Sequence, residues 1–285
     1  MNQRASADAR KSLRTGMALL VIHSATMMSL DGVSKLFCFR PICPHLTVMA
    51  LASGLLPIPV VAQDTGDSPA PTPGLHSLIL SRADKPAMHY AISIPPGYSR
   101  DTPVPLILAL HFGVGGGVGA GAGRDVVRIL IGPALGDLGA IIVAPDSLRG
   151  DWSTPENEEG VTELLDMVVR RYAIDKKRVV VTGYSMGGTG SWHFAEKFPG
   201  RFSAAIPIAS RPPASPAGWR LPVLAIHSDA DQVAPFAPVA ARIEELQRAG
   251  VNAKMITLGG ITHYQVPRFR GALHQAIPWL QEVWK

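Results

Sequence analysis

The residues best suited to chemistry lie in the segment 183–187, whose sequence Gly-Tyr-Ser-Met-Gly has the pattern G-x-S-x-G. An apolar run typical of a buried strand precedes it, and a segment that indicates a helix follows. On a sharp strand-to-helix turn a serine hydroxyl stands above the sheet, and the flanking glycines leave room for the turn. This context predicts that Ser185 is a nucleophile. The alternative is a glycine-rich turn with an incidental serine.

A nucleophilic serine needs a base, and the base needs an acid that orients it. One predicted strand runs into a segment that holds both Asp229 and Asp231, and either could be the acid. The next predicted strand is followed by His263. We expect His263 Nε2 to accept the proton of Ser185 while an aspartate holds Nδ1.

Strands that alternate with helices must bring these side chains together. The clearest helix starts after Thr154, a suitable N-cap, with Pro155 at its first position and one apolar stripe along its length. The expected strands are 78–80, 89–94, 104–110, 140–143, 178–182, 204–208, 223–227 and 253–258, and further helices begin near 124 and cover 187–198, 238–249 and 271–284. This order predicts an α/β protein whose mostly parallel, doubly wound sheet carries helices on both faces. In such a sheet the carboxyl ends of the strands build the site.

Residues 1–62 differ from the rest in charge and composition. They hold six of the 27 Lys and Arg and two of the 22 Asp and Glu, which places +4 of the formal net charge of +5 there. Basic residues precede the apolar run 46–61, which ends in small residues, as in a secretory signal peptide. We expect an N-terminal extension and signal peptide cleaved after Ala62, and a secreted or periplasmic protein. An uncleaved membrane anchor is the alternative.

The expected mature chain consists of a Pro/Thr/Ser-rich linker, 63–74, and one catalytic domain, 75–285. It carries a formal net charge of +1 and no cysteine, because Cys38 and Cys43 both lie in the leader. Thiol catalysis is therefore excluded, and no nucleic-acid partner or stable membrane insertion after cleavage is expected. No two histidines stand at metal-ligand spacing on one helix, so we expect neither a metal nor a cofactor.

Two competing interpretations belong to other classes of protein. The glycine-rich segment 113–123 matches a dinucleotide-binding fingerprint in one register. A segment so rich in glycine matches many registers by chance, follows the third strand rather than the first, and leaves Ser185 and His263 unexplained. We interpret it as a wall of the site. The second alternative is a non-catalytic binding module of the same fold, which would have no need for all three catalytic groups.

With Ser185, Asp231 and His263 in this order on strand ends, the chain resembles the α/β-hydrolase superfamily. Within it, the chain is similar to small secreted esterases of the feruloyl-esterase and polyhydroxybutyrate-depolymerase-like group, which are often described as predicted peptidases. The resemblance runs from about residue 90 to 284 and rests on short motifs in the same order, at 94–98, 105–111, 172–175, 183–188 and 199–205. It implies the α/β-hydrolase fold, Asp231 as the acid, and cleavage of carboxylic esters through an acyl-enzyme intermediate. A peptidase or amidase that uses the same triad is the alternative.

The resemblance also implies an oxyanion hole and a set of substrate contacts. The backbone N–H of Met186 is one expected oxyanion donor, and that of Gly113 is the other, although Phe112 stands where the family usually has glycine. Trp152, Phe112 and Tyr184 are expected to contact a small-molecule or polymer-attached ester. Trp152 has an alternative role as a loop anchor. The oligomeric state stays open.

Overall fold

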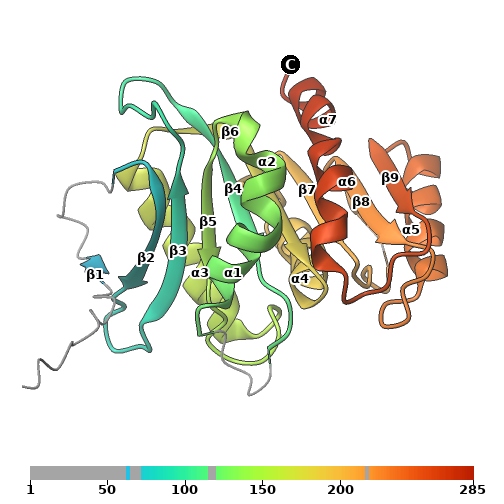
Figure 1. Ribbon diagram of the computed structural model, residues 1–285, viewed down its shortest axis with the longest axis horizontal. Helices are drawn as coiled ribbons and strands as arrows, with labels where there is room; N and C mark the ends of the chain where they lie inside the picture. The colour runs from blue at the N-terminus through green and yellow to red at the C-terminus, as the bar shows by residue number, and fades with distance from the viewer. Residues whose placement is uncertain (1–61, 65–71, 115–119, 216–217) are drawn as a thin grey trace, which may run out of the picture. The chain divides into compact units, whose positions relative to one another are not determined.

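The computed structural model describes residues 62–64, 72–114, 120–215 and 218–285 (Figure 1). All described residues belong to one compact unit, Pro57–Lys285. Almost all of the expected export signal, and most of the expected linker, lie outside the described residues. In the part of the chain that is described, no helix is both long and apolar enough to cross a membrane.

Nine strands of the described residues form one sheet in the order β1-β2-β3-β5-β4-β6-β7-β8-β9. Neighbouring strands are parallel except at β3, which runs antiparallel to both β2 and β5. The strands are β1 (Ala62–Asp64), β2 (Gly74–Leu80), β3 (Met88–Ile94), β4 (Val104–Leu110), β5 (Ile141–Pro145), β6 (Ile174–Tyr184), β7 (Ala204–Ile208), β8 (Val223–Ser228) and β9 (Ala253–Leu258). The predicted mostly parallel sheet is thus confirmed.

Helices cover both faces of this sheet, and each face has its own buried apolar cluster. Helices α3 (Pro155–Arg171), α4 (Met186–Lys197) and α5 (Phe236–Arg248) pack on one face. The other face, toward the viewer in Figure 1, is covered by α1 (Ala122–Val126), a π-helical turn (Val127–Ile131), α2 (Gly132–Leu135), α6 (Arg270–His274) and α7 (Ala276–Val283). Short 3-10 turns occupy Gly136–Leu138, Pro199–Arg201 and Val266–Phe269. The doubly wound arrangement explains why the central strands are apolar on both sides.

Local sequence accounts for most element boundaries and for one difference. Helix α3 begins where predicted, with the Thr154 hydroxyl accepting a hydrogen bond from the Asn157 N–H at 3.4 Å. The prediction of a single closing helix over 271–284 was wrong, because the chain forms α6 and α7 with a break at Gln275. Pro278 has no N–H to donate back to the carbonyl of His274, so the hydrogen-bond ladder is interrupted there.

Candidate active site

The carboxyl ends of β4, β6, β7, β8 and β9 open onto one edge of the sheet. Their register sets the ends level with one another, since Leu110 is opposite Gly183, Tyr184 is opposite Ile208, and Ser228 is opposite Leu258. The loops that follow β6, β8 and β9 carry Ser185, Asp231 and His263. Their convergence is therefore a consequence of parallel strand pairing.

Ser185 occupies a strained turn between β6 and α4. Its φ of 55° and ψ of −114° are unusual for a residue other than glycine. The Ser185 N–H donates to the Ile208 carbonyl at 2.9 Å, which fixes the turn against β7. Any Cβ at Gly187 would overlap the carbonyl oxygen of Leu110, and one at Gly183 would overlap the Gly187 carbonyl. Glycine is thus required on both sides of the serine for backbone to approach backbone.

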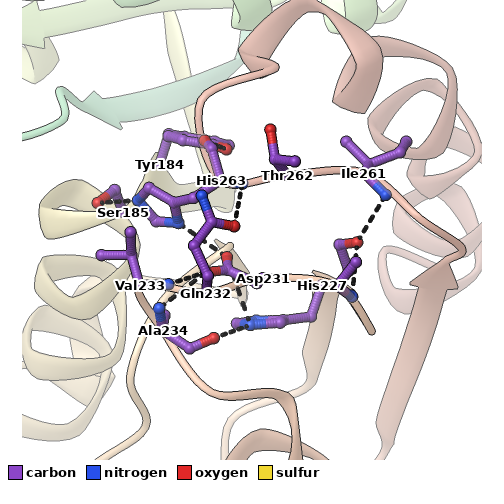
Figure 2. Close-up of polar contacts among 12 residues, drawn as sticks. Tyr184, Ser185, His227, Asp231, Gln232, Val233, Ala234, Ile261, Thr262 and His263 are labelled. Carbon is purple, nitrogen blue, oxygen red and sulfur yellow. Dashed lines mark hydrogen bonds and ion pairs between the residues drawn. The ribbon is translucent and has the colours of Figure 1, made fainter.

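The imidazole of His263 joins Ser185 to Asp231. His263 Nε2 lies 2.8 Å from Ser185 Oγ, and Nδ1 lies 2.8 Å from Asp231 Oδ2 (Figure 2). Asp231 is 8% exposed and His263 is 5% exposed, whereas Ser185 is half-buried and open to a pocket. With a proton on Nδ1, the imidazole can accept the serine proton at Nε2.

The carboxylate of Asp231 is held at both oxygens. Oδ1 accepts hydrogen bonds from the N–H groups of Val233 and Ala234, each at 2.8 Å, and leaves Oδ2 for His263. Burial disfavours the charged form, but the hydrogen bonds from His263 and the two N–H groups outweigh it and lower the pKa of Asp231. Asp229 is exposed, and its Oδ1 accepts the Gly260 N–H at 2.9 Å. Of the two candidate acids, Asp231 is the one that the structure brings to His263.

A second histidine supports the acid loop from below. His227 Nε2 lies 2.8 Å from the Ala234 carbonyl and 3.7 Å from Asp231 Oδ2. Burial is the largest effect on this imidazole and lowers the pKa of His227, so its neutral form is favoured. Because the carbonyl can only accept, Nε2 carries the proton. Figure 2 shows the ring beneath the loop that runs from Asp231 to Ala234.

The loop after β4 lies next to the start of α4, where an oxyanion would be bound. Met186 is the first residue of α4, and the first N–H groups of a helix have no acceptor within it. A Cβ at Gly113 would lie 4.0 Å from the Met186 side chain, so the two expected oxyanion donors belong to neighbouring segments. The role expected of these two N–H groups is to stabilise a developing negative charge beside Ser185.

His111 and Trp152 hold this loop in place. His111 Nε2 accepts the Ser147 N–H at 3.0 Å, so Nδ1 carries the proton and donates to the Phe112 carbonyl at 2.6 Å. Trp152 Nε1 donates to the His111 carbonyl at 3.0 Å, and the indole packs edge-on against the imidazole with ring centroids 4.9 Å apart. These contacts tie the oxyanion-side loop to the loop after β5.

The expected substrate contacts require correction. Trp152 and Tyr184 are each 1% exposed, and neither lines the pocket beside Ser185. Trp152 anchors the loop after β4, whereas the Tyr184 hydroxyl donates to the His263 carbonyl at 2.5 Å. Phe112 is half-buried and packs against the apolar cluster on the α7 face. Trp152 and Tyr184 thus support the site from behind, and Phe112 is not among the residues that line this pocket.

The pocket itself has a volume of about 220 Å³ and opens beside the serine. The residues that line it are Ser185, Met186, Thr189, Ala209, Ser210, Arg211, Val233, Ala234 and His263. Sequence reasoning missed Arg211, which follows the end of β7 by three residues. Its position at the carboxyl edge was the one signal that could have found it. Among the described residues, no group of three or more His, Cys, Asp or Glu side chains could hold a metal ion.

Comparison with known proteins agrees with this architecture. A family model described as the alpha/beta hydrolase fold matches residues 107–236, just under half of the chain. A protein from Aquifex aeolicus with the provisional name carboxymethylenebutenolidase is 27% identical over 150 residues, covering 45% of this chain. The match spans 64% of that relative's length.

Two solved structures have similar folds at low sequence identity. A thermostable esterase has a TM-score of 0.58 at 22% identity, over 73% of this chain and 62% of its own. A fluorophosphonate-binding serine hydrolase of Staphylococcus aureus has a TM-score of 0.57 at 16% identity, over 73% of this chain and 99% of its own. The chain is therefore an α/β-hydrolase-fold protein with an esterase and a serine hydrolase among its structural neighbours.

Proposed function

We propose that the protein is a serine hydrolase that cleaves carboxylic esters through an acyl-enzyme intermediate. The observation that carries the proposal is the continuous hydrogen-bonded path from Ser185 Oγ through His263 to Asp231, with 2.8 Å at each step. The esterase among the structural neighbours supports the choice of an ester over an amide, since both reactions use the same three groups.

The geometry suggests a definite sequence of steps. Ser185 Oγ attacks the ester carbonyl carbon as its proton passes to His263 Nε2, and the backbone N–H groups of Met186 and Gly113 stabilise the oxyanion. His263 returns the proton to the leaving alcohol when the ester C–O bond breaks. A water molecule then attacks the acyl group on Ser185 with His263 again acting as base, which releases the acid and restores the serine.

Substitution of the nucleophile tests the proposal. Ser185→Ala should reduce kcat/KM for 4-nitrophenyl butyrate by at least about 10³-fold, because no other group can form the acyl-enzyme. Ser153→Ala is the matched control, since its hydroxyl is exposed and bonds only to Asp151 Oδ1 at 2.6 Å. A fluorophosphonate probe should add its mass to the wild type and to Ser153→Ala but not to Ser185→Ala.

The results also separate the alternatives. Full ester hydrolysis by Ser185→Ala would refute the assignment. A set of 4-nitrophenyl esters, feruloyl esters and aminoacyl 4-nitroanilides compared at equal enzyme concentration ranks ester against amide cleavage. A higher kcat/KM on the anilides would make the protein a peptidase or amidase. Probe labelling of Ser185 with no turnover of any substrate would favour a binding module.

A further inference from the structure

One charged side chain, exposed to solvent, lines the pocket beside Ser185 without a role in the steps above. Arg211 lines the same pocket as Ser185 and His263. The other described residues that line this pocket, apart from the histidine, have uncharged side chains. No carboxylate in the described ranges forms an ion pair with Arg211, whereas five other arginines each pair with an aspartate or glutamate: Arg82, Arg128, Arg178, Arg201 and Arg242.

The backbone around Arg211 is fixed to the catalytic elements. Its N–H donates to the hydroxyl of Thr189, one turn into α4, at 3.2 Å. Ala209, two residues earlier, turns the chain out of β7 with a φ of 46° and donates its N–H to the Ile226 carbonyl at 2.9 Å. The arginine therefore leaves the sheet from a defined position on the pocket wall.

The guanidinium is also oriented. Arg211 Nη2 donates to the Val233 carbonyl at 3.0 Å, which links it to the loop that carries Asp231. A guanidinium has five N–H donors, and this bond uses one of them. The remaining donors form the planar fork that binds a carboxylate through two parallel hydrogen bonds. Asp231, which lies on the same loop as Val233, already has its oxygens occupied by His263 and two backbone N–H groups.

We propose that Arg211 binds a carboxylate on the substrate, so that the enzyme prefers esters whose acyl or alcohol part is anionic. The inference rests on the proposed ester hydrolysis at Ser185. The pocket that Arg211 and Ser185 both line has a volume of about 220 Å³. The carboxylate lies within a few bonds of the scissile ester, because one pocket wall holds both the arginine and the serine.

Two matched pairs of esters test this specificity. The acyl pair is mono-(4-nitrophenyl) adipate and 4-nitrophenyl hexanoate, which have the same chain length with and without a terminal carboxylate. The alcohol pair is 4-acetoxybenzoate and 4-acetoxybenzamide. The measured quantity is the ratio of kcat/KM for the anionic ester to that for its neutral partner. Wild type, Arg211→Gln and Arg211→Lys are compared, each at low salt and in 1 M NaCl.

The expected result is a ratio that falls about tenfold in Arg211→Gln and less in Arg211→Lys, which keeps the charge but loses the fork. In wild type the ratio should also fall in 1 M NaCl, where the screening length is about 3 Å. A change in the first pair alone assigns the carboxylate to the acyl part, and a change in the second alone assigns it to the alcohol part. The control is Arg220→Gln, since Arg220 is exposed and bonds the Trp219 carbonyl at 2.9 Å outside the pocket.

A ratio that is unchanged in both pairs would overturn the inference. If kcat/KM falls equally on anionic and neutral esters, Arg211 only positions the loop that carries Asp231. Failure of the proposed function gives a different result, because then neither neutral ester is hydrolysed in a way that depends on Ser185.

Discussion

Replacing Asp231 by Asn changes one hydrogen bond of the triad while keeping the shape of the side chain. The amide oxygen must stay on the N–H groups of Val233 and Ala234, because the reverse orientation would direct the NH2 group at two donors, one half-buried and one buried. The NH2 group then faces His263 Nδ1, which must accept. The imidazole proton moves to Nε2, where it prevents acceptance of the proton from Ser185 Oγ.

The hydrogen bonds seen in the structure set the size of this effect. Turning the amide around would leave the buried Ala234 N–H without an acceptor, at about 1–3 kcal/mol, and the half-buried Val233 N–H as well. The competent orientation is thus disfavoured by at least about 2 kcal/mol, which limits it to about one molecule in 30. Loss of the charge that stabilises the imidazolium adds to this, so we expect kcat for Asp231→Asn to fall by about 10³–10⁴-fold.

The assay is hydrolysis of 4-nitrophenyl butyrate, with urea unfolding as a check on the fold. Asp231→Asn keeps both backbone hydrogen bonds, so its unfolding midpoint should lie close to that of the wild type. Asp229→Asn is the matched control and should change kcat/KM by less than about threefold, because that carboxylate is exposed and contacts the Gly260 N–H. Retention of more than a tenth of the activity by Asp231→Asn, or an equal loss in the control, would refute the reasoning.

Two further predictions concern the supports of the site. Tyr184→Phe leaves the buried His263 carbonyl without its donor and should destabilise the fold by about 1–3 kcal/mol, measured by urea unfolding; an unchanged midpoint would contradict it. Burial lowers the pKa of His111 and His227 from 6.5, so below that pH the unfolded chain binds more protons and stability falls as pH decreases. His111→Gln should show a shallower fall between pH 6.5 and 5, and identical slopes would argue against buried neutral histidine as the cause.

The positions of Ser185 and His263, and of the loop that carries the acid, could be predicted because their signals are local, whereas the choice of Asp231 over Asp229 came from the family resemblance. Each follows a short apolar run that forms a strand, and parallel pairing brings the ends of those strands to one edge. The bounds of β7 and β9 agree with the predicted strands for the same reason. Chain order and strand ends thus carried enough information to indicate which side chains would meet.

The surroundings of the triad could not be predicted in this way. Trp152 has the sequence context of an exposed loop, and its burial depends on Gly190, where a Cβ would lie 2.6 Å from the tryptophan Cβ. Arg211 belongs to no motif, and the orientation of its guanidinium depends on the carbonyl of Val233, 22 residues away. Contacts of this kind are set by which loops lie side by side, and local residue patterns do not contain that information.

The close approach of α4 to β4 has a consequence for how the protein can be redesigned. The main chain of Gly187 packs directly against the main chain of Leu110, so the position of Ser185 depends little on the side chains around it. Part of the pocket wall is made by separate segments, at Ser210 and at Val233. Laboratory evolution could therefore exchange residues of these segments to reach new substrates while the catalytic residues keep their positions. Libraries that vary Gly183 and Gly187 would instead yield inactive proteins.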